Sequence, residues 1–115
     1  MHKTELGERA YRDATRWVAA SLPAHALLAA GQTTGAIFHD TDRAFLQWSA
    51  VSAENYPALN RYLAAHGDEL YAALFAYEEA PALVAHLPGT WERVARFREI
   101  SIWRRTGLAP AALSN

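Results

Sequence analysis

Hydrophobic residues recur at helical spacing along most of the chain, and the first segment shows this most clearly. From Thr4 to about Ala20, apolar positions fall on one stripe of a helical wheel, while glutamates and arginines occupy the other face. The stripe contains Leu6, Ala10, Tyr11, Ala14, Trp17 and Val18. Because glutamate and arginine four residues apart stabilise an exposed helix face, the segment predicts an amphipathic N-terminal helix with one solvated side.

Proline, glycine and capping residues divide the rest of the chain into further segments that we also interpret as helices. They begin at or after Pro23, Asp42, Pro57, Asp68, Pro81 and Thr90. Glycines at 31, 67 and 107 suit the C-terminal ends of three of these segments. The pattern predicts an all-α protein, a compact bundle of six or seven short helices in a single domain over residues 1–115. Residues 36–38 also fit a short strand.

The last predicted helix, Trp91 to about Thr106, is apolar on two sides of the wheel. A surface helix has one apolar stripe, so two apolar groups imply contacts on two sides. Either the helix crosses the middle of the bundle with its arginines reaching solvent, or its second face binds a partner or another copy of the chain. The predicted binding face consists of Arg93, Arg96, Phe97, Ile100, Trp103 and Arg104. On this wheel Arg98 lies on the far side, so Arg96 and Trp103 are expected to contribute more to binding.

The segment HDTD, residues 39–42, is the one cluster with the side chains of a metal or acid–base site. Asp40 or Thr41 stands directly before a predicted helix, where its oxygen would accept hydrogen bonds from free backbone amides. Asp42 in the first turn would interact favourably with the helix dipole. Capping explains both acidic residues without a catalytic or metal-binding role, and it is the interpretation we adopt. We therefore expect the protein to bind no cofactor. The alternative is a small metal-dependent enzyme that uses His39, Asp40 and Asp42, provided that a loop turns all three inward.

Composition excludes several classes of protein. The chain has no cysteine, which excludes disulfides, zinc–thiolate sites and cysteine nucleophiles. Its net charge of −1 provides no field that attracts nucleic acid or an anionic membrane. No apolar run approaches the ~20 residues that a membrane-spanning helix needs, and the N-terminal residues are too polar for a signal peptide. We therefore expect a cytoplasmic protein with no nucleic-acid or membrane partner.

A pattern of apolar and proline positions over residues 55–100 resembles a known family. It contains Pro57, Leu59, Tyr62, Leu74, Phe75, Pro81, Leu83, Leu87, Ala95, Arg96 and Phe97. The segment resembles the non-catalytic partner proteins of multinuclear non-haem iron oxidases, which modify cysteines in ribosomally made peptides. In that family the last three positions belong to a helix. The resemblance implies a subunit that grips a precursor peptide and a partner oxidase, with the iron bound elsewhere.

The sequence therefore predicts an accessory subunit more readily than an enzyme. It has no convergent set of polar side chains other than HDTD, while the segment after Thr90 combines surplus apolar residues with arginines. The predicted function is the binding of a protein or peptide partner, specifically the recruitment of a ribosomally made precursor peptide to an iron-dependent oxidase. The alternatives are the metal-dependent enzyme and a helical interaction or inhibitor protein with another partner.

Overall fold

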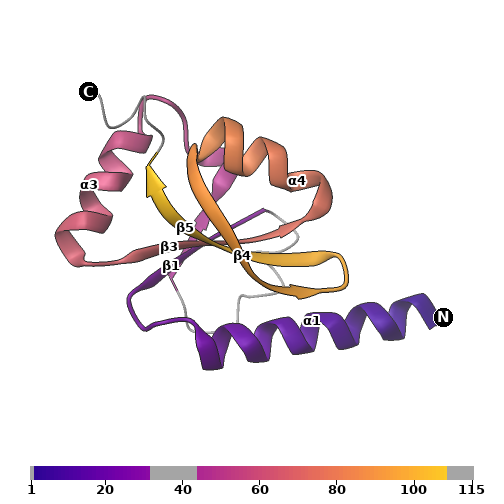
Figure 1. Cartoon of the computed structure of the whole chain (residues 1–115). Helices are drawn as coiled ribbons and strands as arrows, with labels where there is room; N and C mark the ends of the chain where they lie inside the picture. Colours follow the sequence, from indigo (N-terminus) through magenta and orange to yellow (C-terminus); the bar gives the residue numbers. More distant parts are fainter. Residues whose placement is uncertain (1, 32–43, 109–115) are drawn as a thin grey trace.

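The centre of the molecule is a five-stranded mixed sheet, which contradicts the prediction of an all-α bundle (Figure 1). The structure, a computed structural model, describes residues 2–31 and 44–108, with side chains from residue 9 onward. The strands are β1 (Ala26–Ala30), β2 (Ala44–Gln47), β3 (Glu69–Phe75), β4 (Gly89–Phe97) and β5 (Ile100–Leu108), and their order is β2-β1-β3-β5-β4. Strand β1 pairs in parallel with β2 and β3, whereas β5 is antiparallel to both β3 and β4.

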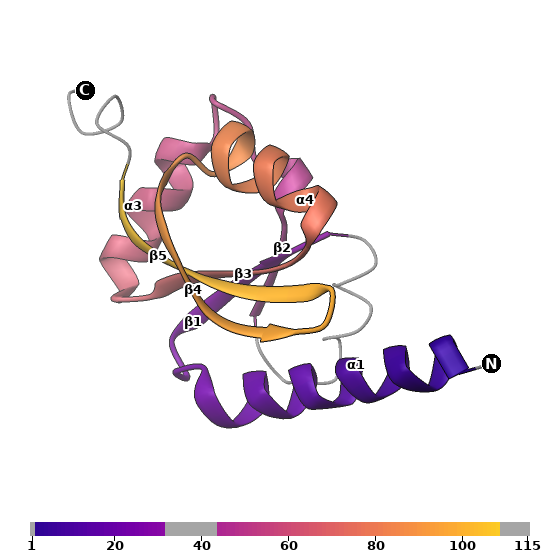
Figure 2. The ribbon, with the colours of Figure 1, turned by 45° about the vertical axis from the view of Figure 1, so that its right-hand side comes forward.

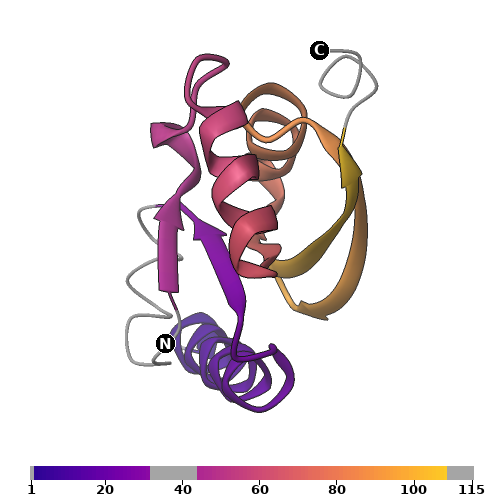
Figure 3. The same cartoon turned by 90° about the vertical axis from the view of Figure 1, so that its left-hand side faces the viewer.

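Helices cover both faces of this sheet (Figures 1 and 3). The long helix α1 (His2–Ser21) crosses one face. The other face carries α3 (Tyr56–His66), the short helix α4 (Ala76–Ala80) and the π-helix η3 (Pro81–His86), and a 3₁₀ turn, η2 (Trp48–Ala50), follows β2. Each face has its own hydrophobic core. The first core joins α1 to Ile100 and Ile102, and the second joins α3 and η3 to Leu70 and Leu74.

Two α-helices lie where the sequence pattern places them, and the helical segment predicted to begin at Pro81 is the π-helix η3. In α1 the predicted stripe is buried at Ala10, Ala14 and Val18, although the helix begins two residues earlier than predicted. Helix α3 has Pro57 in its first turn and ends at Gly67, whose φ of 65° is left-handed. Because glycine has no Cβ, it adopts this conformation at no steric cost and closes the helix. Both predictions are confirmed.

The central strands β1 and β3 replace two of the predicted helices. Both strands are covered by helices on their two faces, so their residues read as continuous apolar runs without the alternation of a half-exposed strand. In β3 every residue except Glu69 is buried, and in β1 only Leu27 is partly exposed. Alanine favours helices in isolation, but burial in the sheet overrides that preference here. Strand β2 and the turn η2 likewise replace the helix predicted after Asp42.

The segment predicted as the last helix is a β-hairpin formed by β4 and β5. Its apolar residues lie on both faces of the sheet, but not in the two groups of the helical wheel: Ile100 and Ile102 pack toward α1, whereas Trp91 and Trp103 pack against the core beneath α3. Register shifts between Thr90 and Trp91 and between Arg93 and Ala95 interrupt the alternation of period two. The apolar spacing therefore imitated a helix with two faces.

Tyr71 on β3 makes the stability of the fold depend on pH in the alkaline range. Burial raises the pKa of the Tyr71 phenol, as does the nearby Glu69 carboxylate, while the Arg104 guanidinium lowers it. Since the folded pKa lies above the ordinary value of about 10, deprotonation favours the unfolded chain. Stability is unaffected well below pH ~10 and falls as the pH rises through the ordinary pKa toward the folded one.

We expect Tyr71→Phe to remove this part of the pH dependence. Urea unfolding of both proteins at about pH 8 and at about pH 10.5 measures it, because only the second value reaches the titration of a phenol. The free energy of unfolding should fall less in the variant between these two pH values. Tyr62→Phe is the control, since Tyr62 is half-exposed on α3. An equal fall in all three proteins would contradict the prediction.

Candidate functional site

The six binding residues predicted from the sequence do not share one face. Ile100 is fully buried in the core beneath α1 and offers no surface to a partner. Arg93 and Trp103 lie together on the α3 side of the hairpin, where the Arg93 guanidinium carbon is 5.9 Å from the centre of the Trp103 ring. Arg96 and Phe97 lie beside α1. The helical wheel grouped these residues because it used the wrong period for a segment that forms two strands.

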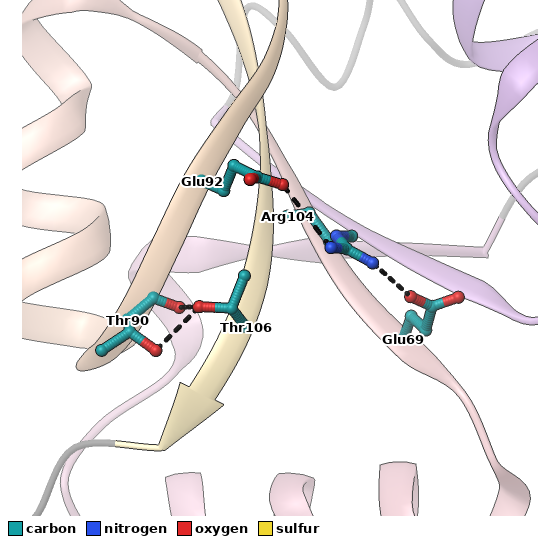
Figure 4. Close-up of polar contacts among 5 residues, drawn as sticks. All are labelled: Glu69, Thr90, Glu92, Arg104 and Thr106. Carbon is teal, nitrogen blue, oxygen red and sulfur yellow. Dashed lines mark hydrogen bonds and ion pairs between the residues drawn. The ribbon is translucent and has the colours of Figure 1, made fainter.

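Arg104 lies on the sheet between two carboxylates (Figure 4). Its Nη1 is 3.7 Å from Glu69 Oε1, and its Nη2 donates a hydrogen bond of 3.5 Å to Glu92 Oε1. All three side chains are about half-exposed, so these ion pairs add little to stability. They do neutralise Arg104, which makes it a poor candidate for binding an anion. At the end of the same strands, the Thr90 and Thr106 hydroxyl oxygens are 2.8 Å apart.

The tip of the β4–β5 hairpin passes over α1 (Figures 1 and 2). Side chains of the two elements line a groove there. Its volume is about 390 Å³, and we refer to it as the hairpin groove. It is lined by Arg9, Ala10, Asp13, Arg96, Phe97 and Arg98. Phe97 is half-buried and packs against Trp17, with 6.4 Å between ring centres. The groove therefore combines charged side chains with the ring of Phe97, whose position is fixed by its packing against the core.

The charge of the hairpin groove is strongly positive for a protein of net charge −1. Three arginines line it, and Asp13 is the one carboxylate among the lining residues. Within the described part of the chain, ion pairs involve Arg104 and none of the groove arginines. Arg96 Nε donates a hydrogen bond of 3.0 Å to the backbone oxygen of Arg98, and its terminal nitrogens donate to none of the described residues. The arrangement suits a ligand that carries carboxylates or other anionic groups.

The backbone of Arg98 is held in an unfavourable conformation at the edge of this groove. Its φ is 58°, and it is the one non-glycine residue with positive φ among those described. The left-handed region costs a residue with a Cβ about 1–2 kcal/mol, so glycine or asparagine is the usual choice at such a turn. An arginine at this position is unfavourable for folding. Strain of this kind tends to occur at functional sites.

Sequence reasoning included Arg96 and Phe97 but missed the rest of the groove. Arg9 and Asp13 lie on the polar face of α1, which we interpreted as solvated, and nothing in a sequence pattern joins them to a hairpin that follows some 80 residues later. The signal for the hairpin was also weak. Its turn, Arg98 and Glu99, lacks the glycine that usually marks a two-residue connection.

A second cluster of polar side chains lies at the carboxyl ends of β1, β2 and β3, where α/β proteins often bind ligands. Glu78 is 5% exposed, and its two oxygens accept hydrogen bonds of 3.0 Å from the Phe75 backbone N–H and from Trp48 Nε1. His86 Nδ1 donates to the backbone oxygen of Val51 at 2.6 Å, and the ring packs edge-on against Trp48. These contacts join η2, α4 and η3, so we interpret the cluster as structural.

The proposed metal site cannot be placed on this fold. His39, Asp40 and Asp42 lie outside the described residues, so metal binding there stays a prediction. The capping interpretation is wrong, because the segment that would follow the cap, Ala44–Gln47, is strand β2 and not a helix. The described ranges contain no group of three or more side chains suited to hold a metal ion. None of the helices described there is long and apolar enough to cross a membrane.

No known family model matches the chain, and no match was found among curated proteins or solved structures. The resemblance to the partner proteins of iron oxidases is therefore without support from these comparisons. In addition, Ala95, Arg96 and Phe97 belong to strand β4, where the pattern of that family has a helix.

Proposed function

We propose that the chain is a non-catalytic recognition domain that binds an acidic segment of a partner protein in the hairpin groove. The observation that carries this proposal is the composition of the groove, in which three arginines and a half-buried phenylalanine face a single carboxylate. A guanidinium pairs with a carboxylate through two parallel hydrogen bonds, which gives both attraction and orientation. Phe97 adds apolar area that a side chain of the partner can cover.

The size of the groove favours a short peptide segment over a large rigid surface. A volume of about 390 Å³ accommodates a few side chains, in the lower range of small-ligand sites. Arginine and aromatic residues together are typical of the positions that contribute most of the energy at protein interfaces. The arginines also accelerate encounter with an acidic partner, an effect that salt weakens. We therefore expect binding that is stronger at low ionic strength.

Two more specific predictions from the sequence are kept as proposals. One is that the partner segment belongs to a ribosomally made precursor peptide, which the domain presents to an iron-dependent oxidase. The other is a cytoplasmic location. A homodimer and a metal-dependent enzyme at His39, Asp40 and Asp42 also stay predictions, and the hairpin groove does not depend on any of them.

Charge reversal in the groove tests the proposed function. The probe is a short fluorescein-labelled peptide rich in glutamate with a central phenylalanine, and its affinity is measured by fluorescence anisotropy. We expect Arg9→Glu and Arg96→Glu each to weaken binding about tenfold or more, because each replaces an attraction with a repulsion. Arg61→Glu on the opposite side of the sheet is the matched control, since it makes the same change of net charge at an exposed residue of α3.

A second peptide in which glutamine replaces every glutamate tests whether charge is what the groove recognises. It should bind weakly to all of these proteins. If the wild-type chain binds neither peptide, or if Arg61→Glu weakens binding as much as Arg9→Glu does, the groove is not the binding site. Circular dichroism confirms that each variant is folded.

Arg98→Gly separates stability from binding at the same site. We expect the free energy of unfolding to rise by about 1 kcal/mol, because relief of the left-handed backbone outweighs the entropy that glycine adds to the unfolded chain. Affinity for the acidic peptide should fall by about fivefold, the upper range for one exposed charge pair. Arg98→Lys is the control and should keep both the strain and the charge. A glycine variant that is no more stable, or that binds equally well, would contradict this role for Arg98.

A further inference from the structure

The α3 side of the hairpin carries tryptophan and arginine in alternation. Trp91 and Arg93 on β4 face Arg105 and Trp103 on β5 as cross-strand neighbours, so each tryptophan lies opposite an arginine. We call these four residues the Trp–Arg face. Trp91 and Trp103 pack against the core beneath α3, and Trp91 Nε1 donates to the backbone oxygen of Leu87 at 3.0 Å. This face is separate from the hairpin groove, which lies on the α1 side.

Among the described residues, only neutral groups hold Arg105 in place. Its Nη1 donates hydrogen bonds of 2.7 Å to the Tyr56 hydroxyl and 2.6 Å to Asn60 Oδ1, both on α3. The guanidinium carbon also lies 5.7 Å from the centre of the Tyr56 ring. The Tyr56 hydroxyl in turn donates to the backbone oxygen of Pro88 at 2.6 Å. Both hydrogens of Nη1 are thus used, while Nε and Nη2 donate to no described residue.

The contrast with the preceding residue shows what Arg105 lacks. Arg104 points to the other side of the sheet and has two carboxylates beside it. Arg105 is partly buried against α3 and has no carboxylate beside it among the described residues. Partial burial of a cation without a counter-charge is unfavourable, since the neutral acceptors compensate only part of the lost hydration. A fixed guanidinium with one unused edge is well suited to two oxygens of an anion.

A second donor on the same strand face also lacks an acceptor. Trp103 Nε1 is buried and has no hydrogen-bond partner, and it is the one such side-chain atom in the described part of the chain. Buried polar atoms of this kind are rare in native proteins, and an absent ligand is one explanation for them. Trp103 precedes Arg105 by two residues, and in a strand this places their side chains on the same face about 7 Å apart.

We propose that Arg105 and Trp103 together form a binding site for an oxyanion, either a carboxylate or a phosphate group. The unused edge of the Arg105 guanidinium holds two oxygens of the anion, and Trp103 donates its indole N–H to the same ligand. Tyr56 and Asn60 fix the guanidinium before the ligand arrives, so little side-chain entropy is lost on binding. This site is independent of the hairpin groove and of the acidic peptide proposed to bind there.

Nuclear magnetic resonance detects both donors directly in the full chain. Inorganic phosphate and sodium acetate are titrated separately at constant ionic strength, and the ¹H–¹⁵N signals of tryptophan Nε1 and arginine Nε are followed. We expect saturable shifts of the Trp103 and Arg105 signals, with the indole proton moving downfield as it gains an acceptor. Assignment comes from Trp103→Phe and Arg105→Gln. The anion that saturates at the lower concentration identifies the ligand as a phosphate or a carboxylate.

Variants decide whether the site is real. Arg105→Gln should abolish the shift at Trp103, while Arg104→Gln, which removes the same charge on the opposite face, should leave it unchanged. Because loss of Arg105 weakens the attachment of α3, Arg105→Lys is the second variant. It keeps the charge but lacks the fork, so we expect binding at least tenfold weaker in a folded protein. Shifts that do not saturate, that sodium chloride reproduces, that persist in Arg105→Gln or that occur at Arg105 alone would overturn the proposal.

Discussion

Gly31→Ala is expected to destabilise the fold by about 3 kcal/mol, the range of a broken buried hydrogen-bond network. A Cβ at this position would lie only 1.8 Å from Glu78 Oε2, and 3.2 Å from Trp48 Nε1. Glu78 would have to move, and its carboxylate is the acceptor that joins Trp48 to the start of α4. Removing the partners of a buried carboxylate leaves a charge without compensation, which is much more costly than the added methyl group. Urea unfolding measures the loss.

A second glycine provides the control for this prediction. Gly67 has a φ of 65° and nothing within 4 Å of an added Cβ, so Gly67→Ala introduces backbone strain without a clash. Gly67→Ala should lower the free energy of unfolding by about 1–2 kcal/mol. Gly31 has no left-handed backbone, and the effect of alanine there is therefore steric.

The double variant identifies the cause. In a Glu78→Ala background, Gly31→Ala should cost little, because the carboxylate that meets the new Cβ is gone. The two substitutions are therefore expected to be strongly non-additive, as is usual for residues in contact. If Gly31→Ala costs the same in both backgrounds, the close approach of Glu78 does not explain why glycine occupies this position.

The Glu78 cluster also shows what a sequence alone can and cannot predict. The helical pattern located α1 and α3 because each has one buried stripe and one exposed face, which is the case that periodicity detects. It failed in β1 and β3 because strands covered on both faces have no alternation. Gly31 directly follows β1, and Glu78 belongs to α4, which directly follows β3. Their contact depends on the parallel pairing of β1 with β3, and residue spacing does not predict that pairing.

The sequence predicted only part of the candidate site, and the reason is similar. The expectation that arginines and aromatic residues after Thr90 form the recognition surface names residues that do lie at the hairpin groove and on the Trp–Arg face. The hairpin places these residues on two sides of the sheet, so that the single face of the helical wheel becomes two separate surfaces. Arg105, which the predicted binding face does not include, lies on the same face as Trp103.

Tyr56→Phe is expected to lower the free energy of unfolding by about 2 kcal/mol, the cost of leaving buried polar groups unpaired. The ring of Tyr56 is buried in the second core, and phenylalanine fills the same space. The lost hydroxyl donates to the Pro88 oxygen and accepts from Arg105, so one deletion removes two hydrogen bonds. These bonds attach α3 to the beginning of β4 and to β5.

Tyr62→Phe is the matched control for Tyr56→Phe, because Tyr62 lies on the same helix and is 51% exposed. Its hydroxyl bonds to no described residue, and we expect almost no change in stability. Tyr56→Phe should also weaken binding of the oxyanion at Arg105, since the guanidinium keeps Asn60 but loses its second anchor. Equal stabilities of the two variants would show that the Tyr56 hydroxyl does not attach α3. If stability fell while the anion bound unchanged, Asn60 alone would be sufficient to position Arg105.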